Sequence, residues 1–361
     1  MKIVQVSLGE RSYPVRIERG RPWRAAKAIA DRFAEGAVAV ISDGTVAPLY
    51  AEPLTRCLRE LGMSPRLRVI APGERSKSMA QAEELIGWLI DTGHGRRRPV
   101  VALGGGVVGD LAGFVASIYL RGVPLVMVPT SLLAMVDSSV GGKTGVNHEA
   151  GKNQIGTFHQ PSLVHVPLGA LRSLADRDLS CGLAEVIKYG VIAEPSLLES
   201  ISRDEAAILD RCPDVIEPIV TLCCRVKAGI VAADETEAGV REVLNFGHTV
   251  GHGIEAATGY TELNHGEAVG LGMVVAARVS RRLGMCGPEV EDAITDALEG
   301  CRLLTDPAPY RDAPWASAMR HDKKARGSDI RFVAVRAIGK VETVSLSMAS
   351  LLRLAGEAFL G

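Results

Sequence analysis

Val100-Val101-Ala102-Leu103-Gly104-Gly105-Gly106-Val107-Val108-Gly109-Asp110 is the stretch of sequence that decides the fold. Its first four residues predict a short buried strand, the glycines a tight turn, and the apolar residues that follow a helix. Glycines let the backbone approach a pyrophosphate closely, and the free N–H groups of a helix start attract its charge. The stretch therefore favours a nucleotide-binding α/β unit.

The surroundings of this turn decide how to interpret it. Its sequence fits the pattern G-x-G-x-x-G. The usual dinucleotide-binding fingerprint, however, follows a first strand and has an acidic residue about 20 positions later, which is missing here. A tight turn without a ligand is the alternative. Against that alternative, Asp43 and Thr45 follow one predicted strand and Gly73-Glu74-Arg75-Ser76-Lys77 follows the next. The ends of parallel strands share one edge of a sheet, and ligands bind there.

Hydrophobic periodicity divides the chain into two parts. β-branched runs predict strands at 37–42, 67–70, 99–103, 125–128 and 163–166, and helical spacing predicts a helix over 78–91. Long Ala-, Leu- and Glu-rich patterns then predict helices at 179–192, 215–233 and 267–283, followed by a hairpin of strands 330–335 and 341–346. We therefore expect an α/β domain with a largely parallel sheet over residues 1–170, and a mainly helical domain over 171–361.

Composition narrows the class of protein. The 361 residues are 47% hydrophobic and 23% charged with a formal net charge of -1, so we expect two globular domains and no nucleic-acid or membrane partner. The N-terminus has no apolar signal core, so we expect a cytoplasmic protein. The seven cysteines show no C-x-x-C spacing. Any metal should therefore take nitrogen and oxygen ligands.

Three of the eight histidines, His248, His252 and His265, lie within eighteen residues. Counting back from His252 in helical steps predicts one polar helical stripe. The stripe would contain His248, Asn245, Arg241 and Glu237. Two histidines four residues apart are typical of H-E-x-x-H metalloproteases, but Thr249 stands where that motif has its glutamate, so the peptidase interpretation is disfavoured.

Glu185 and Lys188 lie one turn apart in a predicted apolar helix. Buried charges need partners, and a simple ion pair is one explanation. Alternatively, Glu185 with His248 and His265 would form a zinc site with an open position for substrate.

Hydroxyls and lysines are concentrated among the glycines of 137–145 and 151–153. We expect a flexible backbone here. Its lysines, Lys143 and Lys152, suit anion contact, although ordinary surface lysines are the alternative.

Taken together, these motifs resemble the 3-dehydroquinate synthase family over nearly the whole chain. The resemblance is carried by G-G-G-V-V-G-D at 104–110, V-D-S-S-V-G-G-K-T-G-V-N at 136–147, G-K-N at 151–153, G-L-A-E-V-I-K-Y-G at 182–190, L-N-F-G-H-T-V-G-H at 244–252, H-G-E-A-V at 265–269 and D-K-K at 322–324.

The resemblance implies a homodimer that binds NAD and a divalent metal, Zn²⁺ or Co²⁺, in a cleft between its two domains. It also implies a phosphate-eliminating lyase of the shikimate pathway. Its substrate, 3-deoxy-D-arabino-heptulosonate 7-phosphate, is transiently oxidised by NAD, loses phosphate, is re-reduced and closes by an internal aldol step to 3-dehydroquinate.

The same resemblance implies roles for individual residues. The implied metal ligands are Glu185, His248 and His265, and the implied acid–base residues are Glu237 and His252, with the substrate's own phosphate as an alternative base. The implied substrate contacts are Lys143, Asn153, Lys188, Lys227, Arg241, Asn245 and Lys324, with Arg121 and Asp137 nearby. The implied NAD contacts are Asp43, Thr45, Glu74, Lys77, Gly105, Gly106, Val107, Asp110, Thr130, Ser131, Lys143, Lys152 and Ser173.

The chain departs from the family in a few places. The family's T-L-P-x-R-E segment reads Ser173-Leu174-Ala175-Asp176-Arg177-Asp178 here, while Ser131 and His159 replace a threonine and a tyrosine. Both serines keep a hydroxyl, and loss of the proline is expected to loosen the linker. The alternatives are another sugar phosphate cyclase, making 2-deoxy-scyllo-inosose or a valiolone, a metal-dependent alcohol dehydrogenase, and a non-catalytic NAD-binding paralogue.

Overall fold

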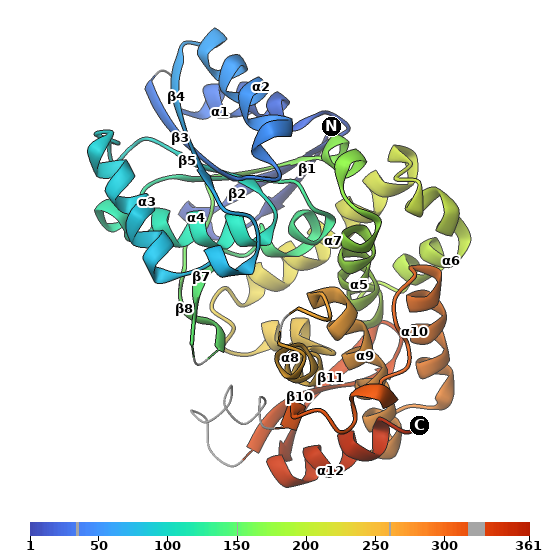
Figure 1. Ribbon diagram of the computed structural model, residues 1–361. Helices are drawn as coiled ribbons and strands as arrows, with labels where there is room; N and C mark the ends of the chain where they lie inside the picture. Colours follow the sequence, from blue (N-terminus) through green and yellow to red (C-terminus); the bar gives the residue numbers. More distant parts are fainter. Residues whose placement is uncertain (34–35, 150, 260, 317–328) are drawn as a thin grey trace. The chain divides into compact units, whose positions relative to one another are not determined.

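The chain divides into two compact units (Figure 1). A computed structural model describes residues 1–33, 36–149, 151–259, 261–316 and 329–361. Unit 1 comprises Met1–Leu174 and Ile216–Thr236, and unit 2 comprises Ala175–Val215 and Glu237–Gly361. No helix among these described residues is both long and apolar enough to cross a bilayer.

Unit 1 is built on a seven-stranded sheet in the order β1-β2-β9-β6-β5-β3-β4. β1 and β2 pair antiparallel, and the remaining neighbours pair parallel. The strands are β1 (Lys2–Val6), β2 (Tyr13–Glu18), β3 (Gly36–Asp43), β4 (Met63–Ile70), β5 (Val100–Gly104), β6 (Leu125–Pro129) and β9 (Leu163–Pro167). The α/β class and all five strands predicted for this part are confirmed, whereas the β1–β2 hairpin was not predicted.

Helices cover both faces of this sheet (Figure 1), with α1 and α2 on one face and α3 and α4 on the other. They are α1 (Ala25–Phe33), α2 (Ala47–Glu60), α3 (Met79–Asp91) and α4 (Gly106–Ile118). α3 begins where Ser78 Oγ accepts a hydrogen bond from Gln81 N at 3.2 Å. α4 is apolar nearly all round because it packs on β5 and β6 on one side and on a hairpin on the other.

That hairpin contradicts the expected flexible backbone. β7 (Lys143–His148) pairs antiparallel with β8 (Gly151–Phe158). Gly145 and Gly156 oppose each other so closely that an added Cβ would lie 2.7 Å from Ile155 O or 2.4 Å from Thr144 O. The glycines therefore permit close strand pairing, and the expectation of a flexible loop was wrong.

Most of α7 (Pro213–Ala233) belongs to unit 1. Cys224 Sγ lies 3.5 Å from Met135 O, and Lys227 Nζ lies 2.6 Å from Asp137 Oδ1. These contacts fasten the helix to a π-helical turn at Ala134–Ser138.

Unit 2 is mainly helical. Its elements are α5 (Asp176–Ile192), α6 (Ser196–Leu209), α8 (His248–Ala257), α9 (His265–Arg282), α10 (Pro288–Gly300), β10 (Asp329–Ala337), β11 (Lys340–Ser347) and α12 (Met348–Ala358). α5 and α9 are buried on almost every side and form its core, which explains why their sequences show little amphipathic contrast. The predicted C-terminal hairpin is confirmed.

The predicted helical stripe from Glu237 to His252 is wrong. Val240–Asn245 forms a 3-10 helix, and α8 starts only at His248 because Gly247 adopts a left-handed φ of 77°. An added Cβ at Gly247 would lie 2.5 Å from Met273 Cγ, so contact with α9 requires glycine at this turn. Of the residues in the predicted stripe, only His248 and His252 lie on α8.

Close packing of α8 on α9 yields a test. A Cβ at Gly272 would lie 2.1 Å from Gly247 O. We expect Gly272→Ala to destabilise the protein by about 3 kcal/mol, the upper end of overpacking penalties, in urea unfolding. Gly356→Ala in α12, where an added Cβ meets nothing within 4 Å, is the control and should be neutral or stabilising. Equal stability of the two variants would contradict this account of the helix contact.

Candidate functional site

The carboxyl edge of the unit 1 sheet gathers the predicted loops, as expected. Asp43 ends β3, and its Oδ1 accepts hydrogen bonds from the backbone N–H groups of Thr45 at 2.8 Å and Val46 at 2.9 Å. Gly44 N donates to Ile70 O at 3.0 Å, which joins this loop to the end of β4. The edge thus presents a carboxylate held rigidly beside exposed backbone.

The glycine turn lies at the same edge. Thr130 N donates to Gly104 O at 2.9 Å, which links the ends of β5 and β6. An added Cβ on Gly105 would lie 3.4 Å from Ser131 Oγ, and one on Gly106 would lie 3.3 Å from Ser138 Oγ. Two hydroxyls therefore border the first turn of α4, which also contains Val107, and this arrangement suits an anionic ligand.

Lys77 is the centre of a polar network in unit 1. Its side chain is 5% exposed, and its Nζ lies 2.5 Å from Asp110 Oδ2 and also contacts Asn153 Oδ1. Burial raises the pKa of Asp110, and the positive charge of Lys77 opposes that increase. The network brings together three of the predicted residues.

Asn147 extends this network and was missed by the sequence prediction. Its Nδ2 donates to Glu74 Oε1 at 2.8 Å, and its Oδ1 accepts from Asn153 N at 3.0 Å. Lys152 Nζ lies 3.9 Å from Glu74 Oε1. Asn147 belongs to the motif at 136–147, and the only available signal was its place between two lysine-bearing segments.

Other predicted residues of unit 1 lie outside this network. Lys227 Nζ contacts both Asp137 Oδ1 at 2.6 Å and Asp137 O at 2.7 Å. Ser173 Oγ lies 2.6 Å from Tyr50 Oη, so its hydroxyl already has a structural partner. Lys143 is exposed at the start of β7. Arg121 follows the far end of the 13-residue α4, roughly 20 Å along the helix from the glycine turn.

The histidine cluster lies in unit 2. The candidate ligand atoms of His248, His252 and His265 all lie within 4.8 Å of one another. Glu185 Oε1 lies 3.5 Å from His248 Nε2 and 3.7 Å from His265 Nε2. The Glu185 side chain is fully buried, and Lys188 contacts its other oxygen. Three helices, α5, α8 and α9, thus bring a carboxylate and imidazoles to one point.

The outer ring nitrogens orient two of these imidazoles. His248 Nδ1 lies 3.1 Å from Phe246 O, and His265 Nδ1 lies 3.3 Å from Glu255 Oε2. Because a carbonyl and a carboxylate accept hydrogen bonds, each Nδ1 carries a hydrogen, and the two Nε2 atoms are the ones that face Glu185. Sequence reasoning missed Glu255.

The electrostatics of the cluster fit a cation. Burial lowers the pKa of His248 to about 3, with help from the charge of Lys188, so its imidazole is neutral and able to act as a ligand. Burial also acts to lower the pKa of His265, but hydrogen bonds to Glu185 and Glu255 outweigh it and raise that pKa to about 10. Positive charge is therefore favoured between the two carboxylates, as a zinc site of nitrogen and oxygen ligands requires.

A second polar group lies on the segment before α8. Asn245 Nδ2 donates to Glu237 Oε1 at 3.0 Å, and Glu237 has a left-handed φ of 61°. Arg241 is 1% exposed in the 3-10 helix between them. Lys324, the remaining predicted substrate contact, lies outside the described residues.

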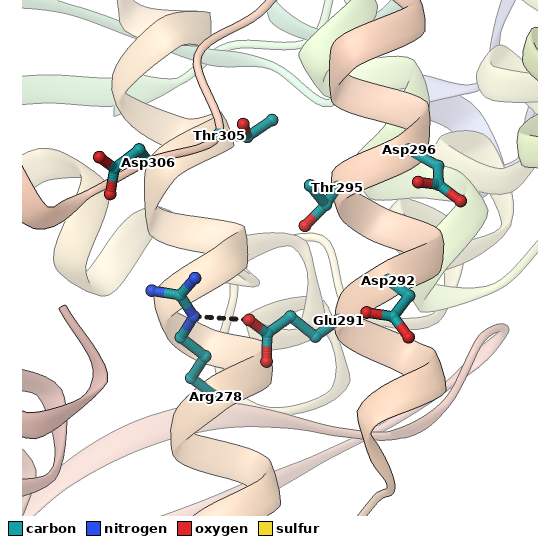
Figure 2. Close-up of a pocket in the computed structure, with 7 residues that line it drawn as sticks. All are labelled: Arg278, Glu291, Asp292, Thr295, Asp296, Thr305 and Asp306. Carbon is teal, nitrogen blue, oxygen red and sulfur yellow. Dashed lines mark hydrogen bonds and ion pairs between the residues drawn. The ribbon is translucent and has the colours of Figure 1, made fainter. Parts of the chain in front are cut away.

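A separate pocket of about 600 Å³ lies between α9 and α10 (Figure 2). Acidic side chains and Arg278 line it, and Arg278 Nε donates to Glu291 Oε1 at 2.6 Å. None of the predicted site residues lines this pocket.

The Lys77–Asp110 pair yields a stability test. Lys77→Met would leave Asp110 Oδ2 without its cation, so we expect a loss of about 3 kcal/mol, the low end for a broken buried pair because Asp110 is 20% exposed. Urea unfolding measures this loss. Lys77→Met combined with Asp110→Leu should recover most of the stability, and no recovery would contradict a direct pairing.

Comparisons with known proteins identify the family of the chain. Family models described as 3-dehydroquinate synthase N-terminal and C-terminal match residues 67–181 and 182–325. A 3-dehydroquinate synthase of Acidithiobacillus ferrooxidans is 47% identical over 340 residues, covering 94% of this chain and 93% of the relative. One from Pelobacter propionicus is 45% identical, covering 99% of both chains.

A solved structure of a related enzyme shares the fold of this chain. The structure of a 2-epi-5-epi-valiolone synthase from Streptomyces hygroscopicus, with NAD⁺ and Zn²⁺ bound, matches with a TM-score of 0.87 and 28% identity over 98% of each chain. With two family models covering most of the sequence and relatives this similar over nearly its full length, the chain belongs to the 3-dehydroquinate synthase family.

Proposed function

We propose that this protein is a 3-dehydroquinate synthase, a lyase that converts 3-deoxy-D-arabino-heptulosonate 7-phosphate to 3-dehydroquinate and phosphate in the shikimate pathway. The observation that carries the proposal is the convergence of Glu185, His248 and His265 at one point, in a chain whose relatives of that name are 45–47% identical. The same resemblance supports a homodimer in the cytoplasm.

The metal proposed here is Zn²⁺ or Co²⁺, held by Glu185, His248 and His265. NAD is proposed to bind at the carboxyl edge of unit 1, where Asp43, the glycine turn and the Lys77 network lie. When bound, the metal would supply Lewis acidity to the substrate's hydroxyls, and NAD would supply reversible hydride transfer. The valiolone synthase structure, which holds both groups, supports this pairing.

The proposed substrate contacts are mainly cations and amides. Lys188 and Arg241 are almost fully buried, so an anion that reaches them meets charges with little competition from water. Each charge-assisted hydrogen bond contributes roughly 1.5–3 kcal/mol. A substrate with both phosphate and carboxylate groups suits such a set. The further contacts proposed are Lys143, Asn153, Lys227, Asn245 and Lys324, with Arg121 and Asp137 nearby.

His252 is proposed to move protons, together with Glu237. His252 is exposed, whereas His248 on the preceding turn is 9% exposed and lies beside Glu185. An accessible imidazole can exchange a proton with substrate, while a buried neutral imidazole serves better as a ligand. The different surroundings of the two residues support different roles.

Phosphate release tests the proposed reaction. The purified protein, loaded with Zn²⁺ and catalytic NAD, should release one phosphate per heptulosonate phosphate consumed, without net growth of NADH absorbance. Cyclisation of sedoheptulose 7-phosphate or glucose 6-phosphate instead would assign another sugar phosphate cyclase. Steady NADH accumulation would assign a dehydrogenase. Absence of both metal retention and turnover would indicate a non-catalytic paralogue.

Alanine variants of the two α8 histidines should differ in metal content. His248→Ala removes a proposed ligand, so we expect the purified variant to retain no stoichiometric Zn²⁺. His252→Ala should retain the metal and lose turnover by about 10²–10⁴-fold, the usual contribution of a general acid or base. Elemental analysis beside the phosphate assay measures both effects. Equal metal loss in the two variants would overturn this division of roles.

A further inference from the structure

The His265 imidazole lies between two buried carboxylates. Glu185 Oε1 is 3.7 Å from its Nε2, and Glu255 Oε2 is 3.3 Å from its Nδ1. The Glu255 side chain is only 4% exposed. Burial of a carboxylate costs free energy unless a cation or hydrogen-bond donor compensates it. The imidazole of His265 is a group that can compensate Glu255.

The place of Glu255 on α8 explains how it reaches His265. It follows His248 by seven residues and is therefore two turns along the same face of the helix. The two nitrogens of an imidazole point away from each other, so an ion bound at Nε2 beside Glu185 is not accessible to a carboxylate at Nδ1. Glu255 therefore acts on the ring and does not serve as a further ligand.

The backbone of His265 is fixed separately, from α5. Gly266 N donates to Cys181 Sγ at 3.0 Å, and the approach is so close that a Cβ on Gly266 would lie 2.2 Å from Cys181 O. Arg177 binds both carboxylate oxygens of Glu267 at 2.7 Å. Arg177 and Cys181 precede Glu185 by eight and four residues, so one face of α5 contacts the first turn of α9. These contacts place the Cα of His265 but do not involve its ring.

We propose that Glu255 is a positioning residue for the metal site. Its carboxylate holds the hydrogen on His265 Nδ1, fixes the rotation of the ring and increases the electron density at Nε2. This inference rests on the proposed metal site. Because α5 already fixes the backbone, loss of Glu255 reduces metal affinity far more than it disturbs the fold. Outer partners of metal-bound histidines typically change affinity by about 10- to 100-fold.

Three variants of the full-length protein test this role. Glu255→Ala removes the acceptor, and Glu255→Gln keeps the size and one acceptor oxygen but removes the charge. Glu291→Gln is the matched control, since this acid is 15% exposed, lies in the same unit and pairs with Arg278 in a pocket that no histidine lines (Figure 2). Affinity for Zn²⁺ alone is measured by competition with a chromophoric chelator, and visible absorption of the Co²⁺-loaded protein reports ligand geometry.

We expect Glu255→Ala to weaken Zn²⁺ binding about 10- to 100-fold and to alter the Co²⁺ spectrum. The Zn²⁺ affinity of the Glu255→Gln variant should lie between those of Glu255→Ala and the wild type. Glu291→Gln should bind Zn²⁺ as tightly as the wild type. The urea midpoints of the metal-free Glu255→Gln and Glu291→Gln proteins should be similar. If the Glu255→Ala protein does not fold, the Zn²⁺ affinity and Co²⁺ spectrum of Glu255→Gln test the role of Glu255.

Two other results would overturn the inference in distinguishable ways. Wild-type affinity and spectrum in both Glu255 variants, while His248→Ala loses Zn²⁺, would refute the role of Glu255 and leave the proposed function intact. Failure of the wild-type protein to bind Zn²⁺ would refute the metal site itself, and the proposed function with it.

Discussion

Burial of the Glu185 carboxylate is the constraint on which unit 2 depends. A fully buried carboxylate is stable only beside positive charge, and Lys188 one turn away supplies part of it. The remaining oxygen faces His248 and His265 from two other helices. The two imidazoles reach Glu185 because α9 packs on α5 and α8 packs on α9, so this one carboxylate constrains the packing of three helices.

Glycines make that packing possible. Gly266 lies against the Cys181 backbone, and Gly272 lies against Gly247, at distances that exclude any side chain. In the motif G-H-T-V-G-H, Gly247 and Gly251 both face α9. In unit 2, therefore, glycine brings backbones together so that the imidazoles of neighbouring helices converge.

The sequence predicts features that depend on local pattern and misses those that depend on tertiary contact. Strand periodicity correctly predicted the parallel sheet, and polar residues in an apolar helix pointed to Glu185. The predicted helical stripe failed because Gly247 forms a left-handed turn packed against Met273, which is distant in sequence. Glu255 was missed because one glutamate in a helical pattern resembles a solvated residue. Its seven-residue spacing from His248 was the available signal. That spacing points to the site only once Glu255 is known to be buried.

The buried lysines of unit 1 are paired with carboxylates, and this pairing affects how the ligand site proposed there would bind an anion. Lys77 and Lys227 are each 5% exposed, and each contacts an aspartate, Asp110 or Asp137. An incoming anion must therefore compete with a carboxylate for the ammonium group, so its net gain is the difference between two ion pairs. A phosphate, with between one and two negative charges at neutral pH, competes better than a hydroxyl or a single carboxylate. Pairing of these lysines with aspartates thus lowers their affinity for anions in general and favours the more highly charged anions.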